Sequence, residues 1–281
     1  MREVPGRTIT VNGRNLYVEQ SGTGSDWVVF EAGQGCGRTC WDLVLPLLHD
    51  QANLVTYDRA GFGRSGAVRG PLSIDGMAAD LVAMVESVVP EKVVLVAHSM
   101  GGLVARRAAE SLATRLTGLL LIDPTIETAP VYDTWDQTTA RIDRMLALAQ
   151  PLCRVRPIRR LMSGNLKALY PPDTYRAMLD ENLDSAGVAQ TRSEVRAVAE
   201  AIPQLRTRPP ALPACPTLVL TANRTPKGRE ETYAGIREHQ RRYIDSLPHG
   251  RGEGVDAGHF IQAEQPQPVA AAVRQLLGST G

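Results

Sequence analysis

Val93-Val94-Leu95-Val96-Ala97-His98-Ser99-Met100-Gly101-Gly102 is the stretch that decides the fold of this chain. Its first five residues are apolar and three of them are β-branched, which predicts a strand buried on both faces. Residues 103–109 are good helix formers, so a helix should begin almost at once. Such an abrupt change leaves Ser99 in a tight, exposed turn, where Gly101 and Gly102 let the strand and helix backbones approach each other. This small-x-Ser-x-Gly pattern of a nucleophile elbow, with Ala97 as its first small residue, favours a nucleophilic Ser99 over a structural serine.

Strand and helix patterns alternate on both sides of this stretch. Short apolar or alternating runs predict strands over residues 7–11, 15–19, 27–30, 53–57, 119–122, 217–221 and 251–255. Helical spacing predicts helices over residues 41–48, 74–89, 230–243 and 268–277. This order predicts an α/β fold with a mostly parallel central sheet and helices on both faces. The active site of such a sheet lies beyond the carboxyl ends of its strands, where Ser99 and Asp123 each follow one.

Strand patterns are missing between about residues 130 and 208. Helices are expected there over residues 135–149, 158–169, 172–183 and 193–202, before a proline-rich return at 207–213. A helical block inserted between two sheet strands predicts a cap over the active site. The expected domains are therefore a core of residues 1–129 and 209–281 and a cap of residues 130–208. Within the cap, Trp135 and Met145 are predicted to line an apolar pocket for the substrate.

Composition limits the classes of partner. The formal net charge of +1 gives no general attraction to nucleic acid or to anionic membranes. The longest apolar runs are far shorter than the ~20 residues that span a bilayer. The first six residues lack an apolar signal core, so we expect a cytoplasmic protein. Cys36 and Cys40 have no second ligand pair nearby, so free thiols and no metal site are expected. The oligomeric state is not predicted.

Four motifs along the chain occur in the order typical of one large family. They are Glu31-Ala32-Gly33-Gln34-Gly35, residues 57–65, Ala97-His98-Ser99-Met100-Gly101-Gly102 and Ala257-Gly258-His259-Phe260. On these motifs, and over nearly its whole length, the chain resembles a serine-nucleophile, esterase-like member of the α/β-hydrolase superfamily. The resemblance implies the α/β-hydrolase fold with an inserted helical cap. It says little about the substrate.

A serine hydroxyl becomes a good nucleophile when a base takes its proton, and an imidazole suits this task near pH 7. His259 follows the last predicted strand, and the resemblance makes it the base. His98 adjoins Ser99 on the same strand, where alternation directs its side chain elsewhere. The other candidates lie on helical or loop patterns and are weaker: His49, His239 and His249.

The resemblance also assigns the loop after the early strand. The backbone N–H groups of Gln34 and Met100 would form an oxyanion hole, and Gly33 would lie against the substrate. Asp58 and Arg59, in the second motif, are interpreted as a turn-stabilising ion pair or cap that takes no part in the chemistry.

The acid of the triad departs from the commonest pattern. Most relatives place an aspartate after the strand that follows the cap, but residues 221–226 contain no carboxylate. Asp123 is the position that some capped relatives use instead, and Pro124 should favour an extended backbone there. Asp256 is a poorer candidate because it nearly adjoins His259, and Glu230 because it begins a helix. Asp123 is therefore the predicted acid.

Together these residues predict a cofactor-independent serine hydrolase that cleaves esters of small or medium, mostly apolar acyl compounds. Ser99 would attack, His259 would shuttle the proton and Asp123 would orient the imidazole. Other serine chemistry stays open: carbon–carbon bond, lactone or amide hydrolysis, or perhydrolysis. An aspartate nucleophile would indicate epoxide or haloalkane substrates, and Ser99 argues against both. The alternative of another class is a ligand-binding receptor that keeps the fold but has no turnover.

Overall fold

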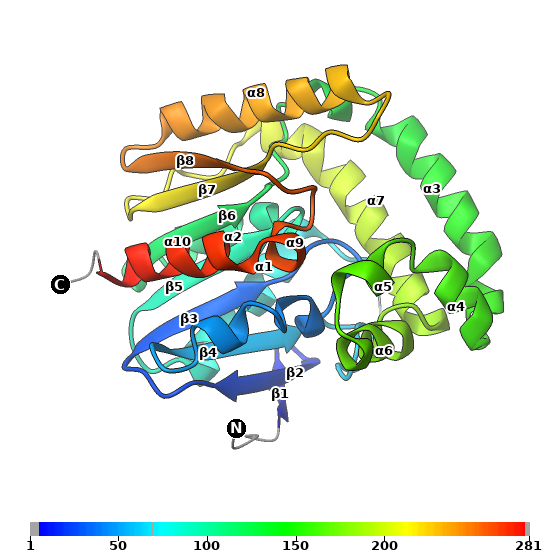
Figure 1. Ribbon diagram of the computed structural model, residues 1–281, viewed down its shortest axis with the longest axis horizontal. Coiled ribbons are helices and arrows are strands. Elements are labelled where there is room, and N and C mark those ends of the chain that lie inside the picture. Colours follow the sequence, from blue (N-terminus) through cyan, green and yellow to red (C-terminus); the bar gives the residue numbers. More distant parts are fainter. Residues whose placement is uncertain (1–5, 69, 279–281) are drawn as a thin grey trace.

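A computed structural model describes residues 6–68 and 70–278. The first five residues, on which the expectation of a cytoplasmic protein largely rests, lie outside this range. Eight strands form one sheet in the order β1-β2-β4-β3-β5-β6-β7-β8 (Figure 1). The strands are β1 (Arg7–Val11), β2 (Arg14–Ser21), β3 (Asp26–Glu31), β4 (Ala52–Asp58), β5 (Val93–His98), β6 (Leu116–Ile122), β7 (Thr217–Ala222) and β8 (Gly250–Val255). β2 pairs antiparallel with both of its neighbours, β1 and β4. The remaining neighbours, along β4-β3-β5-β6-β7-β8, pair parallel.

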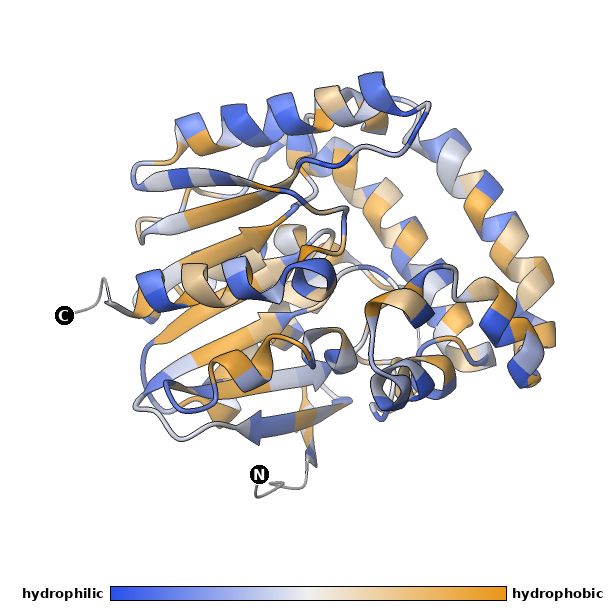
Figure 2. Cartoon of the chain, viewed as in Figure 1, coloured by the Kyte–Doolittle hydropathy of each residue, from blue (hydrophilic) through white to orange (hydrophobic). Residues whose placement is uncertain are grey.

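Helices cover both faces of the sheet, as the alternating pattern predicts. One face packs against α1 (Ile74–Val88), α2 (Gly101–Ser111) and α8 (Glu230–Ser246). The other packs against α9 (Ile261–Glu264), α10 (Pro266–Gly278) and two 3₁₀ helices, η1 (Arg38–Trp41) and η2 (Leu45–Leu47). The hydropathy colouring of Figure 2 shows the central strands as apolar, in agreement with a core on both faces. Ser73 caps α1 by accepting from the Gly76 N–H.

The single helix predicted over residues 41–48 is wrong. The chain forms η1 and η2 there instead, because Pro46 lies inside the segment and cannot donate a hydrogen bond to a preceding carbonyl. All four cysteines are free, as predicted for Cys36 and Cys40. None of the helices in the described ranges is long and apolar enough to cross a membrane.

Helices without strands fill the connection between β6 and β7. They are η3 (Pro130–Tyr132), α3 (Trp135–Ala149), η4 (Gln150–Arg154), α4 (Arg156–Met162), α5 (Leu166–Leu169), α6 (Pro172–Glu181) and α7 (Ser185–Thr207). We call residues 130–207 the inserted helices. Figure 1 shows them beyond the carboxyl ends of the parallel strands, on the side opposite the chain termini. The helix predicted over residues 158–169 is broken into α4 and α5 around Gly164, whose φ of 54° lies in the left-handed region.

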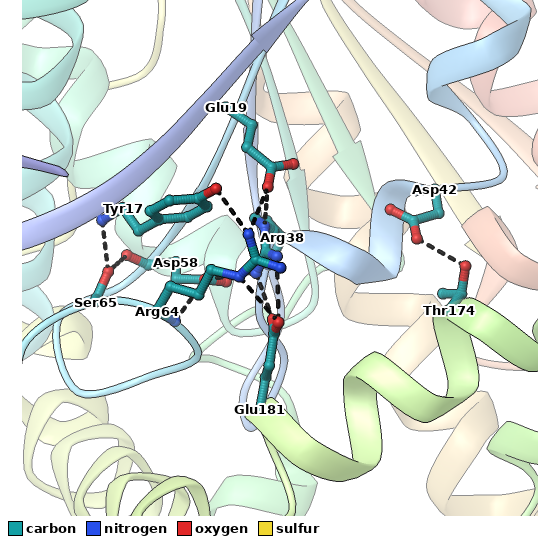
Figure 3. A network of polar contacts seen from close by, with 9 residues as sticks. All are labelled: Tyr17, Glu19, Arg38, Asp42, Asp58, Arg64, Ser65, Thr174 and Glu181. Carbon is teal, nitrogen blue, oxygen red and sulfur yellow. Dashed lines mark hydrogen bonds and ion pairs between the residues drawn. The ribbon is translucent and has the colours of Figure 1, made fainter. Parts of the chain in front are cut away.

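Polar contacts hold the inserted helices to the core. Figure 3 shows Glu181 reaching from α6 toward two arginines of the core, Arg38 and Arg64. The Glu181 carboxylate accepts from Arg38 Nη1 at 2.5 Å and from Arg64 Nε at 3.2 Å. Arg38 is nearly buried and also bonds Asp58 at 2.7 Å and Glu19 at 2.8 Å. Because removing one member would leave a buried charge unpaired, this network constrains where α6 can lie.

A second contact of α6 involves a titratable side chain. Thr174 Oγ1 donates to Asp42 Oδ2 at 2.7 Å, next to the Arg38 network (Figure 3). Burial raises the pKa of Asp42 to about 6, although the hydrogen bond from Thr174 and the charge of Arg38 oppose the rise. The folded state therefore favours the protonated carboxyl, and the free energy of unfolding falls as pH rises from about 4 to about 6.

Asp42→Asn should remove this dependence, because an amide oxygen still accepts from Thr174 and carries no charge. The free energy of unfolding of the variant, relative to the wild type, should increase between pH 4 and pH 7 by up to about 3 kcal/mol. Urea unfolding at several pH values measures the difference. Asp173→Asn, at a 93% exposed carboxylate next to Thr174 on α6, is the matched control and should follow the wild type. A constant difference between Asp42→Asn and the wild type across this range would contradict the assignment.

Candidate active site

The parallel register of β5 and β6 brings Ser99 and Asp123 to one place. His98 pairs with Ile122, so the two residues that follow lie side by side at the carboxyl edge of the sheet. The Ser99 N–H donates to the Ile122 carbonyl at 3.0 Å. Ser99 and Asp123 both have left-handed backbones, with φ of 54° and 39°, which is unusual for residues other than glycine. Both turns direct the side chain away from the strand, beyond the edge of the sheet.

The extended backbone that Pro124 predicts at Asp123 is therefore wrong. Two hydrogen bonds hold the turn against the preference of a residue before proline. The Asp123 N–H donates to the Leu220 carbonyl at 2.7 Å, and the Thr125 N–H donates to the Ser99 carbonyl at 3.1 Å. The sheet hydrogen bond from β7 and the contact with the elbow outweigh the local steric preference.

His259 lies between these two side chains. Its Nε2 is 2.9 Å from Ser99 Oγ, and its Nδ1 is 2.6 Å from Asp123 Oδ2. The histidine follows β8 and comes from the far end of the chain, as its position after the last strand predicts. A hydroxyl, an imidazole and a carboxylate are thus connected in one chain of hydrogen bonds. Such a chain can move a proton from the hydroxyl to the imidazole while the carboxylate stabilises the resulting positive charge.

The surroundings of Asp123 favour its ionised form. The side chain is almost buried, and Oδ1 accepts from Gln240 Nε2 at 3.0 Å and from the Ala222 N–H at 3.3 Å. Burial alone would raise the pKa of Asp123, but the hydrogen bond and charge of His259, with these two further donors, hold it below its usual value. The other carboxylate considered beside His259 lies elsewhere, since Asp256 is 90% exposed and faces Arg224. Glu230 begins α8 and accepts from the Gly228 N–H.

His98 supports the site from the sheet side. Its ring lies 4.7 Å from the His259 ring between centroids, and its Nε2 is 2.8 Å from the His259 carbonyl oxygen. Burial, followed by the neighbouring His259, lowers the pKa of His98 to about 3, so the imidazole is neutral and Nε2–H donates to this carbonyl. Strand alternation correctly separates His98 from Ser99, but the histidine contacts His259, which the sequence analysis missed.

The glycine loop after β3 approaches the elbow closely. A Cβ atom at Gly33 would lie 2.6 Å from His98 Nδ1, so only glycine fits there. Gln34 and Met100 both line the cavity beside Ser99. Within the described part of the chain, neither backbone N–H donates to a protein acceptor. Two residues whose backbone N–H groups have no acceptor in the described part of the chain therefore line one cavity beside the Ser99 hydroxyl.

Arg59 fixes the position of this loop. It is buried, and its guanidinium donates to the Ala32 carbonyl at 2.6 Å and to the Gly33 carbonyl at 2.7 Å. It also bonds two buried carboxylates, Glu31 at 2.8 Å and Glu194 of α7 at 2.7 Å. Their charges raise the pKa of Arg59 although burial alone would lower it.

Asp58 and Arg59 were expected to form a turn-stabilising ion pair or cap. The cap is present at Asp58, which accepts from the Arg64 N–H, but the ion pairs of both residues go to partners outside the turn. The Asp58 carboxylate accepts from Arg38 Nη1 and from the backbone N–H groups of Arg38 and Arg64. Only the contact with Arg64 belongs to the local turn. A sequence signal for the structural role of Arg59 did exist, because it directly follows a buried strand. Nothing in the sequence indicated its partner Glu194, which lies 135 residues away.

A cavity of about 190 Å³ opens beside Ser99. Apart from the residues described above, it is lined mainly by apolar and aromatic side chains: Pro124, Thr125, Tyr132, Trp135, Val198, Tyr233 and Ile236. The structure thus places Trp135 at the cavity. Met145 is not among the lining residues, and its side chain is 60% exposed. Helical spacing identified α3 as amphipathic but did not show which apolar residues face the core, and Tyr132, Tyr233 and Ile236 were missed.

Comparisons with known proteins agree with this architecture. The chain is 32% identical over 108 residues to a pimeloyl-[acyl-carrier protein] methyl ester esterase of Aliivibrio salmonicida, which is 38% of this chain and 39% of that protein. It covers less than half of two other curated relatives. A 3-oxoadipate enol-lactonase of Acinetobacter baylyi is 22% identical over 89% of this chain and 88% of its own length.

Solved structures match the fold at low sequence identity. A laboratory-evolved variant of a potato epoxide hydrolase superposes with a TM-score of 0.80 at 16% identity, over 98% of this chain and 99% of that one. Residues 28–272 match the sequence profile described as the Alpha/beta hydrolase family. Because this match covers most of the sequence, the chain belongs to the alpha/beta hydrolase family.

Proposed function

We propose that this protein is a cofactor-independent serine hydrolase that cleaves carboxylic esters of small to medium, mostly apolar acyl compounds. The observation that carries the proposal is the pair of hydrogen bonds at His259, 2.9 Å to Ser99 Oγ and 2.6 Å to Asp123 Oδ2. Ser99 is the nucleophile, His259 the general base and acid, and Asp123 the carboxylate that orients the imidazole.

The reaction follows from these roles. Ser99 Oγ attacks the ester carbonyl carbon while His259 Nε2 takes the hydroxyl proton. The backbone N–H groups of Gln34 and Met100 bind the oxyanion, and losing one such donor typically costs roughly 3 kcal/mol of transition-state stabilisation. His259 then returns the proton to the departing alcohol and leaves an acyl-enzyme. Water then attacks the acyl carbonyl carbon while His259 takes one of its protons, and His259 returns this proton to Ser99 Oγ as the carboxylic acid leaves.

The size and lining of the cavity support the substrate class. At about 190 Å³ it is smaller than the ~300 Å³ at the lower end of typical ligand pockets, which favours compact acyl groups. Tyr132, Trp135 and Ile236 offer apolar surface to such a group, whereas Gly33, which was predicted to lie against the substrate, is not among the residues that line the cavity. The similarity to an esterase over part of the chain agrees with an ester substrate.

Lactone hydrolysis is the second candidate. The relative described as an enol-lactonase is covered over 88% of its length, and a lactone is an internal ester that the same three residues can open. Epoxide opening is disfavoured despite the structural similarity to an epoxide hydrolase, because the residue at the elbow is Ser99 and not an aspartate. Assays of nitrophenyl esters and small lactones side by side would decide between ester and lactone hydrolysis.

Ser99→Ala should abolish turnover. The variant lacks the attacking oxygen, and we expect kcat on a short nitrophenyl ester to fall at least ~10³-fold, with the fold retained. Ser111→Ala, at the far end of the helix α2 that follows the elbow, is the control and should keep full activity. Comparable activity in pure Ser99→Ala protein would refute the serine mechanism.

Asp123→Asn tests the acid. The amide keeps the shape and can still accept from Gln240, but it would donate to His259 Nδ1 and favour the wrong imidazole tautomer. Activity at pH 7 should fall ~10²- to 10⁴-fold with little change in KM. Asp256→Asn is the matched control because that carboxylate is exposed. Loss of turnover in Asp256→Asn, with more than about half retained in Asp123→Asn, would assign the acid to Asp256.

Trp135→Ala tests the acyl pocket. Enlarging the cavity beside Ser99 should raise kcat/KM for longer nitrophenyl esters relative to shorter ones, by about 10-fold across the series. Met145→Ala, on the same helix but exposed, should leave this ratio unchanged. If both variants lower activity on every ester equally, Trp135 is only a packing residue.

A further inference from the structure

The outer end of the inserted helices carries a concentrated apolar surface. Six large apolar side chains are exposed in the described part of the chain, and five of them lie within residues 145–161. These five are Met145, Leu148, Leu152, Val155 and Leu161, which we call the outer patch. Leu148 and Leu161 protrude most, with 78% and 80% of their surface exposed. Single exposed apolar side chains are ordinary in soluble proteins, but five large ones within 17 residues indicate a surface that binds a partner.

These side chains belong to adjoining elements. Met145 and Leu148 lie on α3, Leu152 on η4 and Leu161 on α4, and η4 contacts both helices. The opposite side of α3 packs against α7. Figure 1 shows α3 and α4 along the edge of the molecule farthest from the termini, and Figure 2 shows apolar colour along this edge. The outer patch therefore faces away from the core.

Positive charge surrounds the outer patch. Residues 141–167 contain seven arginines and lysines and one acidic residue, so this stretch has a net charge of +6 while the whole chain has +1. Its only acid, Asp143, is paired with Arg192 and Arg196 of α7.

The charge next to the exposed leucines is not neutralised within the protein. Arg156 and Arg159 share Asp180. The remaining basic residues of the stretch are exposed and form no ion pair with the residues that the structure describes: Arg141, Arg144, Arg154, Arg160 and Lys167. On α3, Arg141 lies three residues before Arg144 and four before Met145, and Leu148 follows these two by four and three residues, so cationic and apolar side chains share one exposed helix face.

We propose that the outer patch docks on the surface of a membrane that contains anionic phospholipids. Protruding leucines can enter the boundary between headgroups and acyl chains, while the surrounding arginines meet lipid phosphates. The docking is peripheral and needs no membrane-spanning helix. The expectation that membranes are not partners rested on the net charge of the whole chain, which averages out this local concentration.

Other occupants fit the outer patch less well. A second copy of the chain would bring two stretches of net charge +6 together, which is repulsive. A folded protein partner is usually bound through aromatic anchors, and the outer patch contains only aliphatic side chains and methionine. Anionic lipid matches both the charge and the protruding aliphatic surface. This proposal concerns binding and stands independently of the proposed esterase activity.

Vesicle sedimentation of the whole 281-residue chain tests the proposal. The chain should bind vesicles of phosphatidylglycerol and phosphatidylcholine in equal parts, and binding to phosphatidylcholine alone should be at least ~10-fold weaker. High salt should weaken the binding by screening the arginines. Equal binding to both vesicle types, or binding to neither, would overturn the proposal.

Two variants test the charge and the apolar side chains separately. The partition coefficient should fall on the order of 100-fold in the charge variant Arg144→Gln/Arg154→Gln/Arg160→Gln. It should fall at least ~10-fold in the apolar variant Leu148→Ser/Leu161→Ser. The control for the charge variant is Arg208→Gln/Arg229→Gln/Arg251→Gln, which removes the same number of charges elsewhere on the surface. The control for the apolar variant is Leu212→Ser, which changes an exposed leucine outside the patch. Both controls should bind as the wild type does, and circular dichroism checks that every variant is folded.

Several outcomes would refute membrane docking. Wild-type binding by both patch variants, or equal losses in the controls, would show that the patch is not the binding surface. The patch is a self-association face if the protein does not bind vesicles but forms a dimer in sedimentation velocity, while Leu148→Ser/Leu161→Ser stays monomeric. The patch binds an acidic protein partner if the protein does not bind vesicles but binds poly-L-glutamate, and if the charge variant loses this binding.

Discussion

The parallel register between β5 and β6 is the constraint on which the candidate site depends. It places Ser99 beside Asp123, and both then leave the sheet through left-handed backbones. Such conformations cost about 1–3 kcal/mol each in residues other than glycine, so the surrounding structure must enforce them. The neighbouring buried strands hold them in place, because the Ser99 N–H donates to Ile122 and the Asp123 N–H donates to Leu220. His259 can bridge the two side chains because both turns point to the same edge.

Buried ion pairs connect this edge to the inserted helices. Arg59 holds the Ala32 and Gly33 carbonyls of the loop and also bonds Glu194 of α7, while Arg38 bonds Glu181 of α6. Pairs of this kind add little net stability, because desolvation opposes the attraction, but breaking one is costly. Their main effect is positional: the loop at the cavity and the helices above it cannot move independently.

The fold could be predicted from sequence because its signals are local. Apolar runs located the strands, and helical spacing gave α3 its observed bounds, Trp135–Ala149. Resemblance to known motifs, rather than spacing, selected His259 and Asp123, and the structure brings both to Ser99. The remaining features depend on contacts between distant residues. The partner of Arg59 is 135 residues away, and the left-handed backbone at Asp123 is set by β7, which a rule for residues before proline cannot include. The prediction that Met145 lines the pocket was wrong for a similar reason, because periodicity identifies the apolar face of a helix but not the element that this face packs against.

The central claim is that Ser99 forms a covalent acyl-enzyme. Its most direct test is rapid acid quenching during turnover of a slow nitrophenyl ester, followed by mass spectrometry of the intact protein and its peptides. The account predicts one added acyl group, located on Ser99, that disappears when the substrate is exhausted. Release of nitrophenol without any acylated protein, or an acyl group on a different residue that turns over at the catalytic rate, would contradict it.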